Sequence, residues 1–392
     1  MEKLKHNFDE YNERRGSDSK KYGSGDYKED VLPMWIADTD FRVPEPVAKA
    51  AVERASHELY GYPYNLSEFN IVVKNWMKKR HNWDIKEDDV EFVHGVVHGA
   101  LYTLEAFTHP GDKVVCLTPL FGPLKEIVVD NGRQIVSSSM IEEDGYYTIN
   151  FDDLEKKMKD PRVSMFILCN PHNPVGKVYT KEELERIGDI CIRNNVVVFN
   201  DEVHADIIYK GNHHISFPSI KKEFADITVT GMNPGKTFNV AGARTAAVII
   251  QNKHMMDKFL IARKNAKALG RTVFGQAIFI ACYRDCEYYV DQLVEYLEAN
   301  VDYVKDYIKN NIPEISFRKP EGMFLLWLDC RKLRLNQNEL VKLFTDVGKI
   351  AMNSGTSFGE EGTGFMRLNI AVPRSVVEEG MSRIKKAIDS LS

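Results

Sequence analysis

Short apolar segments that alternate with amphipathic segments constrain the fold of this chain more than any other feature of its sequence. The apolar segments are rich in β-branched residues, and the stretches between them show the i, i+3, i+4 spacing of helices. Strands without a polar face belong to sheets that helices cover on both sides, and such sheets are mostly parallel. We assign strands to DKVVCLT, QIVSSSM, VSMFILCN, NVVVFND, DITVTG and RTAAVII. The sequence therefore predicts an α/β fold in which a mostly parallel sheet is sandwiched by helices.

The segments before and after this alternating region have a different residue pattern. Residues 1–30 are polar and rich in Gly and Ser, so we expect an arm there rather than a core element. After about residue 285 the sequence predicts a second, smaller α+β domain, which the arm completes. The expected elements outside the sheet are helices at 43–59, 67–81 and 285–311, strands at 315–320, 322–330 and 365–372, and a closing helix.

Chain length supports more than one domain. Domains usually contain about 100–200 residues, and this chain has 392. We predict an N-terminal arm at 1–44 that belongs to the small domain, a large domain at 45–285 that holds the ligand site, and a small C-terminal domain at 286–392.

Composition and charge exclude several classes of function. Hydrophobic residues make up 43% and charged residues 28% of the chain, as in a soluble globular protein. The net charge of -5 is modest and no block of like charge occurs, so we expect neither a nucleic-acid partner nor a membrane partner. The N-terminus has no apolar run of signal-peptide length, and no segment is long enough to span a membrane. We therefore expect a cytoplasmic protein that acts on a small molecule.

Neither cysteine nor histidine spacing predicts a metal site. The six cysteines form no CxxC pair and mostly lie in apolar segments, so we expect reduced core residues. Cys282 and Cys286 share a helix face, but no histidine pair lies near them. His94 and His98 have a metal-like spacing without a carboxylate between them. We predict no bound metal.

Ligands of open α/β sheets bind at the carboxyl ends of the strands, so the polar residues after each apolar segment are candidates for a site. HGVVHG at 94–99 follows the segment VEFV and leads into a helix, where glycine lets backbone N–H groups approach a phosphate. An ordinary strand-to-helix turn explains this motif equally well.

Three further strand ends carry polar residues. NPHNPVG at 170–176 is a rigid turn that aims an asparagine side chain from the strand end. Asp201 directly follows a buried strand, where an acid is costly unless a cation or a hydrogen-bond donor pairs with it. Lys236 lies in a loop bent by Gly and Pro between two apolar strands, where desolvation and cationic neighbours lower the pKa of an amine.

Taken together in this order, the motifs resemble those of the class I/II aminotransferase superfamily of fold-type I pyridoxal 5'-phosphate (PLP) enzymes. Within it, they are most similar to the cystathionine β-lyase group of carbon-sulfur lyases. The likeness extends from about residue 30 to the C-terminus. It depends on MWIADTDF, HPGDKVVCLTPLFGP, NPHNPVG, DEVHAD, GKTFNVAG and FMRLNIAVPR.

The resemblance implies that PLP is the cofactor and that Lys236 holds it as a Schiff base and removes the Cα proton of the substrate. Asp201 matches the acid that pairs with the pyridine nitrogen and keeps the ring an electron sink. Asn173 matches the asparagine that hydrogen-bonds the O3' oxygen. His204 takes the place where many relatives carry a tyrosine near O3'. Phe121 stands where the lyase group usually has a tyrosine stacked on the ring.

The resemblance also implies residues for the phosphate of the cofactor. The backbone N–H groups of Val96 and Val97 and the side chain of Arg244 match phosphate ligands of relatives. Gly235 replaces a serine that commonly binds phosphate, so Asn233 and Arg244 are expected to compensate. Tyr62 matches a tyrosine that reaches the phosphate across a dimer interface, which implies a homodimer with shared active sites.

Substrate contacts follow from the same resemblance. Arg367 matches the arginine that grips the α-carboxylate through a bidentate pair. Trp35 and Ala37 lie in the segment that closes over the substrate in relatives, although simple packing accounts for them as well. Thr39 stands where the lyase group commonly has methionine.

The implied function is a β-elimination that cleaves cystathionine or a related cysteine S-conjugate to pyruvate, ammonia and a thiol. The alternative is a PLP-dependent aminotransferase of a small amino acid, which uses Lys236 in the same way. A non-enzymatic alternative also stays open, because members of this lyase group are known that bind a transcription activator.

Overall fold

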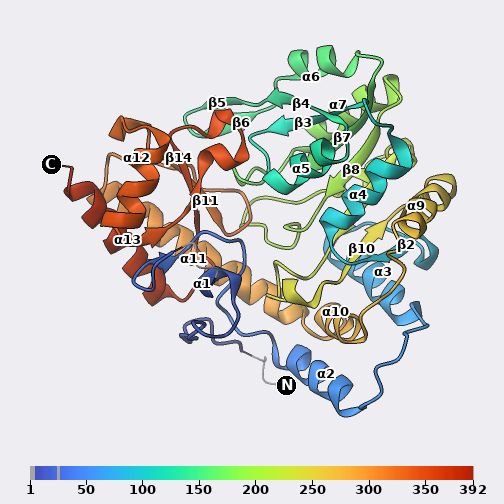
Figure 1. Cartoon of the computed structure of the whole chain (residues 1–392), viewed down its shortest axis with the longest axis horizontal. Helices are drawn as coiled ribbons and strands as arrows, with labels where there is room; N and C mark the ends of the chain where they lie inside the picture. The colour runs from blue at the N-terminus through green and yellow to red at the C-terminus, as the bar shows by residue number, and fades with distance from the viewer. Residues whose placement is uncertain (1–4, 24–26, 392) are drawn as a thin grey trace.

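The computed structural model describes residues 5–23 and 27–391, and within them a seven-stranded sheet forms the core of the larger part of the molecule (Figure 1). Its order is β2-β10-β9-β8-β7-β3-β4, and all neighbouring pairs are parallel except the two that involve β10. The strands are β2 (Val90–Val93), β3 (Lys113–Thr118), β4 (Gln134–Ser139), β7 (Val163–Cys169), β8 (Val197–Asp201), β9 (Thr228–Met232) and β10 (Ala246–Ile249). The predicted mostly parallel sheet is confirmed.

Helices cover both faces of this sheet, as the apolar strands require. On β3, Val115 and Leu117 belong to one core cluster, whereas Val114 and Cys116 belong to another. Because neighbouring side chains of a strand point to opposite faces, the two clusters lie on opposite sides of the sheet. The first contains residues of α6 (Phe151–Met158) and α7 (Lys181–Arg193), and the second contains residues of α4 (Val96–Phe107), α5 (Gly122–Asp130) and α9 (Lys253–Asn265).

Several further elements extend this core. They are α2 (Glu45–Ser56), α3 (Ser67–His81), α8 (Lys222–Ala225) and α10 (Val273–Asp285), with a hairpin of β5 (Ile141–Glu143) and β6 (Tyr146–Thr148). The helix expected at 67–81 has the predicted bounds, and the one expected at 43–59 is shorter at both ends. All six cysteines are buried, which confirms that they are core residues.

The C-terminal part contains a three-stranded antiparallel sheet of order β11-β14-β13. Its elements are α11 (Glu287–Asn311), β11 (Leu325–Asp329), α12 (Gln337–Lys342), β13 (Asn353–Ser354), β14 (Phe365–Asn369) and α13 (Arg374–Asp389). The strand expected at 315–320 is wrong, since only Ser316 makes an isolated bridge, to Asp329. Cys282 lies in α10, but that helix ends before Cys286, so the two cysteines do not share one helix.

The N-terminal arm packs against the C-terminal part (Figure 1). β1 (Leu32–Pro33) pairs in parallel with β12 (Ile350–Ala351). Phe8 is only 5% exposed, although we expected no core element before Val31. The side chain of Lys21, next to the start of the short helix α1 (Lys20–Gly23), is also buried.

The pairing of β1 with β12 joins the arm to the C-terminal part, and the division of the chain into an arm and two domains stays a prediction. Among the described residues, no helix is both long and apolar enough to cross a membrane.

Candidate active site

The carboxyl ends of β3, β7, β8 and β9 meet at one edge of the sheet, because these strands are parallel neighbours. Asp201 is the last residue of β8, and Phe121, Asn173 and Lys236 lie in the segments that follow β3, β7 and β9. Four of the side chains expected from the sequence therefore come from one edge, where open α/β sheets bind ligands.

Lys236 projects from a loop that is tied down on both sides. Before it, the backbone N–H of Gly235 donates to Asn233 Oδ1 at 3.0 Å. A Cβ atom at Gly235 would lie 3.1 Å from that same oxygen and 3.3 Å from Ala241 Cα, so a larger residue there would require its neighbours to shift. The Lys236 Nζ atom donates to the backbone oxygen of Ala37 at 2.6 Å. Burial, followed by the nearby Arg367 cation, lowers the pKa of Lys236 to about 8, which makes it a usable nucleophile and base.

Asp201 is a buried carboxyl group, 5% exposed, with a single hydrogen bond in the described part of the chain. The backbone N–H of Val203 donates to its Oδ1 atom at 3.1 Å. Burial raises the pKa of Asp201 to about 6, although the nearby Lys236 cation opposes this shift. A buried acid with so little compensation is suited to receive a cationic or hydrogen-bonding group of a ligand.

Arg367 of β14 is a buried cation whose three hydrogen-bond partners are all neutral. It donates to Asn173 Oδ1 at 3.1 Å, to the backbone oxygen of Trp35 at 3.1 Å and to Asn353 Oδ1 at 2.7 Å. Its Nε atom is buried without a partner in the described residues. Burial lowers the pKa of Arg367 to about 9.

No carboxylate of the described residues forms an ion pair with Arg367. Charged groups almost never stay buried unless they are paired. Because the Arg367 guanidinium lacks a counter-charge among the described residues, its position suits an anionic ligand, such as the carboxylate of a small acid.

His204 lies within the field of the same charged groups. It is 2% exposed, and its Nδ1 atom has no hydrogen-bond partner among the described residues. Burial, with the Lys236 and Arg367 cations, holds the pKa of His204 well below its ordinary value, so the imidazole is neutral. Phe121 precedes the first turn of α5 and packs against both core clusters of the sheet.

The N-terminus of α4 lies next to Asp201. Gly231 of β9 pairs with Asp201, and a Cβ atom at Gly231 would lie 2.6 Å from Val96 Cγ1. No side chain caps α4, so the first backbone N–H groups, including those of Val96 and Val97, are available to an anion.

Arg244 lies near this end of α4. It is exposed, and its charge adds to burial in lowering the pKa of His98 in the first turn of the helix. These groups suit the phosphate of a cofactor. Asn233 differs, because its side-chain oxygen already accepts from Gly235 and only its amide nitrogen remains to reach a ligand.

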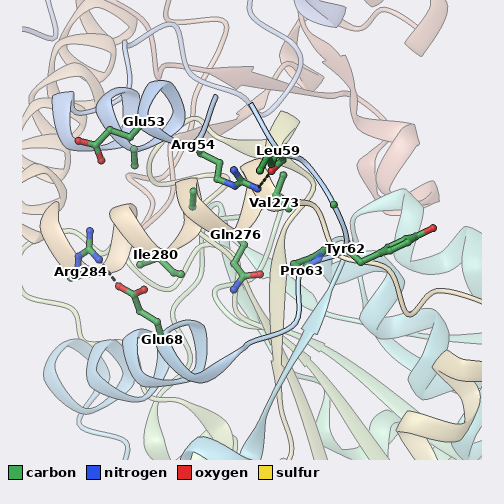
Figure 2. Close-up of a pocket in the computed structure, with 13 residues that line it drawn as sticks. Glu53, Arg54, Leu59, Tyr62, Pro63, Glu68, Val273, Gln276, Ile280 and Arg284 are labelled. Carbon is green, nitrogen blue, oxygen red and sulfur yellow. Dashed lines mark hydrogen bonds and ion pairs between the residues drawn. The ribbon is translucent and has the colours of Figure 1, made fainter. Parts of the chain in front are cut away.

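Tyr62 is not brought to this cluster within one chain. Its side chain is fully exposed, at 101%, and Figure 2 shows it pointing away from the other labelled residues. It lines a groove of about 520 Å³ between α2, α3 and α10, and the ion pair of Arg284 with Glu68 lies in the same groove. The expected contact of Tyr62 with a cofactor in a partner subunit stays a prediction.

Sequence reasoning missed three groups of the site. Asn353 accepts from Arg367, and the ring of Phe358 lies 4.7 Å from the Arg367 guanidinium carbon. Asp38 raises the pKa of Lys236 through its charge, which partly offsets burial. Asp38 lies in a motif that we had noted, whereas the segments around Asn353 and Phe358 carry no pattern that indicates a site.

Comparisons with known proteins agree with this geometry. A family model described as aminotransferase class I and II matches residues 22–384. Cystathionine beta-lyase PatB of Bacillus subtilis (strain 168) is 37% identical over 97% of this chain and 100% of its own.

Two solved structures superpose closely on the whole chain. A PLP-bound protein of Clostridium difficile 630, assigned as an aminotransferase, is 38% identical, with a TM-score of 0.96 over 98% of this chain and 100% of its own. Cystalysin of Treponema denticola, which contains PLP, is 33% identical, with a TM-score of 0.96 over 99% of this chain and 100% of its own. The chain belongs to the aminotransferase class I and II family.

Proposed function

We propose that the protein is a PLP-dependent carbon-sulfur β-lyase that cleaves cystathionine or a related cysteine S-conjugate. The observation that carries the proposal is the unpaired cation of Arg367 close to Lys236, an amine whose pKa burial lowers to about 8. Together these groups suit a small amino acid as substrate. Arg367 binds its carboxylate, and Lys236 removes its Cα proton. The similarity to cystathionine beta-lyase PatB supports the lyase over other reactions of the family.

The described residues fit PLP. Lys236 offers the amine for covalent attachment, and Asp201 offers a buried acid for the pyridine nitrogen. Among the residues that the structure describes, His204 Nδ1 lacks a partner, and Asn173 Oδ1 accepts only from Arg367. The uncapped start of α4 and the exposed Arg244 suit the phosphate. When bound, PLP supplies an electron sink for the charge that develops at Cα of the substrate.

The side chains divide the reaction among them. Arg367 holds the α-carboxylate, with Asn173 and Asn353 fixing the plane of its guanidinium. Lys236 takes the proton from Cα, and Asp201 keeps a proton at the pyridine nitrogen. The Cβ–S bond breaks, and the thiolate takes up a proton from solvent and leaves as a thiol. One water molecule then hydrolyses the remaining three-carbon fragment to pyruvate and ammonia.

An aminotransferase of a small amino acid is the second candidate, and Phe121 is the observation that favours it. A phenyl ring can stack on a cofactor but cannot deliver a proton to a leaving thiolate. If that proton limits elimination, transfer of the amino group to a 2-oxo acid dominates, because both reactions share Lys236 and Asp201.

We expect L-cystathionine to yield pyruvate, ammonia and a thiol in equal amounts without any added oxo acid. The expected result follows from elimination at Cβ, which needs no second substrate. The measurement quantifies all three products with and without 2-oxoglutarate, and follows conversion of the cofactor to its pyridoxamine form. Turnover that strictly requires 2-oxoglutarate and releases no thiol would overturn the lyase in favour of the aminotransferase.

Arg367→Lys is expected to raise KM about 100-fold or more, with a smaller effect on kcat. Lysine cannot form the paired hydrogen bonds of a guanidinium, and truncating one partner of a buried charged pair costs about 2–5 kcal/mol. The measurement compares an S-substituted cysteine with its α-carboxamide, and the variant should lose the preference for the free acid.

Arg263→Lys is the matched control for that variant. Arg263 is also buried, at 9% exposed, but it pairs with Glu91 at 2.8 Å and lies on α9. We expect this control to keep the wild-type KM. An R367K protein that still discriminates between acid and amide would show that the carboxylate binds elsewhere.

We further propose a homodimer in which Tyr62 of each chain reaches the phosphate site of the other. Its full exposure beside a groove of about 520 Å³ supports this arrangement. A cytoplasmic location remains part of the same proposal.

A further inference from the structure

Asp206 is the last residue of the motif DEVHAD, and neither the proposed chemistry nor the cofactor site uses it. Its side chain is 7% exposed, yet it accepts hydrogen bonds from three side chains. Trp76 Nε1 donates to Oδ1 at 2.9 Å, and His81 Nε2 lies 3.0 Å from the same oxygen. Both donors lie on α3, so this carboxylate joins α3 to the segment that follows β8.

The third donor connects Asp206 to the candidate active site. Thr237 directly follows Lys236, is 0% exposed, and donates its Oγ1 hydrogen to Asp206 Oδ2 at 3.2 Å. In the described part of the chain this is the one hydrogen bond to that oxygen. The residues after Thr237 are fixed by other groups, since the Phe238 ring stacks on Tyr289 and Asn239 Nδ2 donates to the Phe41 oxygen at 3.0 Å.

A second carboxylate–histidine pair lies beside the first. Glu202, which directly follows Asp201, is 3.3 Å from His214 Nε2. The rings of His214 and His81 meet edge to face with their centroids 5.4 Å apart. Burial opposes ionisation of both acids, but the neighbouring histidines hold the pKa values of Asp206 and Glu202 below the ordinary range.

A cavity of about 290 Å³ lies against this cluster. It is lined by Asp206, His81 and His214 from the cluster, and by Arg80, His213 and Asp291 among other residues. Arg80 also lowers the pKa of Asp206 through its charge, and Asp291 is paired with Arg80 at 2.8 Å. The group that accepts the hydrogen bond from Thr237 is therefore the ionised carboxylate of Asp206, which the side chains of α3 hold in place.

We propose that Asp206 is a positioning residue for Lys236 and acts through the hydroxyl group of Thr237. The hydrogen bond fixes the backbone on the carboxyl side of Lys236, as the Asn233–Gly235 bond fixes it on the other side. The Lys236 amine is thereby kept buried and directed at the Ala37 oxygen. This inference rests on the proposed PLP function and adds a residue to it that touches neither cofactor nor substrate.

Thr237→Val tests the proposal, because valine keeps the volume of threonine and removes the donor. We expect the dissociation constant for PLP, measured by fluorescence, to rise about tenfold, which is the effect of losing one buried hydrogen bond. In the cofactor-free protein, the pH midpoint of the rate at which PLP attaches to Lys236 should rise by about one unit. It should rise because burial is the main cause of the lowered pKa of Lys236, and a loosened loop relieves that burial.

Two matched variants separate positioning from packing. Thr237→Ser restores the hydroxyl group, and we expect it to recover the wild-type midpoint and PLP affinity. Thr228→Val removes a buried hydroxyl at the other end of β9, where it donates to the Phe224 oxygen at 2.6 Å, and should leave both values unchanged. Thermal melting of each protein reports stability separately.

The outcomes distinguish this inference from the proposed function. Borohydride treatment of wild-type protein that places no label on Lys236 would sink the proposed function. If Lys236 of the wild-type protein is labelled but T237V leaves the pH midpoint and the PLP affinity unchanged, only the role of Asp206 is disproved. The same holds if T237S is as impaired as T237V, or if T228V shifts the midpoint as far as T237V does.

Discussion

Replacing Lys236 with alanine is expected to abolish the visible absorbance of the purified protein and to reduce turnover more than about 1000-fold. The variant loses both the covalent attachment point and the base, and base catalysis alone contributes roughly 100- to 10,000-fold. The burial that lowers the pKa of Lys236 to about 8 leaves a usable fraction of neutral amine near pH 7. The measurements are an absorbance spectrum, product formation, and peptide mapping after borohydride reduction of the wild-type protein.

Lys177 provides the control for this prediction. It is buried, at 3% exposed, and it directly follows the neighbouring motif NPHNPVG, but it pairs with Glu183 at 3.0 Å. The Tyr146 hydroxyl and Glu183 raise the pKa of Lys177 despite its burial, so its amine stays protonated. We expect Lys177→Met to retain the label on Lys236. Recovery of the pyridoxyl group on Lys177 in wild-type protein would disprove the assignment.

Asp201→Asn is expected to lower kcat about 100- to 1000-fold while weakening cofactor binding much less. A neutral amide no longer favours the protonated pyridine nitrogen, and a single preorganised electrostatic partner is worth about 3–4 kcal/mol in the transition state. Asparagine keeps the volume of aspartate, and its oxygen can still accept from the Val203 N–H that now lies 3.1 Å away. The measurements are kcat at saturating substrate and the dissociation constant for PLP.

The fold of the variant needs its own check. Asp201 is buried with a raised pKa, so removing its charge is not expected to lower the melting temperature of the cofactor-free protein. A near-normal kcat in a fully loaded D201N protein would contradict the pairing with the pyridine nitrogen. A large loss of affinity with normal kcat would instead assign Asp201 to cofactor retention alone.

The pattern of apolar residues was enough to locate the strands in the sequence, but not to predict their direction or their pairing. Runs such as VSMFILCN contain no polar face, and the structure buries them between two helical layers as predicted. The antiparallel direction of β10 was not predictable, because a strand of apolar residues carries no pattern that indicates its direction in the sheet. The segment 315–320 alternates like a strand, yet only Ser316 finds a partner, since pairing depends on a neighbour that local pattern does not reveal.

Some residues of the candidate site were expected from the local sequence pattern, others only from the family resemblance, and a few from neither. The location of two residues near the sheet edge was predictable, because Asp201 directly follows a buried apolar run and Lys236 lies in a loop bent by Gly and Pro between two apolar strands. Their roles stay predictions. Arg367 came from the family resemblance, and its buried position with neutral partners agrees with the expected role. Asn353, Phe358 and Asp38 were missed, because their contacts and charge act on residues that come close to them only in the folded chain.

The arm contributes two backbone oxygens whose donors lie far along the chain. The Ala37 oxygen accepts from Lys236, a separation of 199 residues, and the Trp35 oxygen accepts from Arg367, a separation of 332 residues. During translation, residues 35–37 leave the ribosome long before either donor exists. The large sheet can form while synthesis continues, but the substrate pocket cannot close until β14 has emerged. Ribosome-bound intermediates that end before β14 are therefore expected to lack Arg367 and, with it, the proposed binding site for the substrate carboxylate.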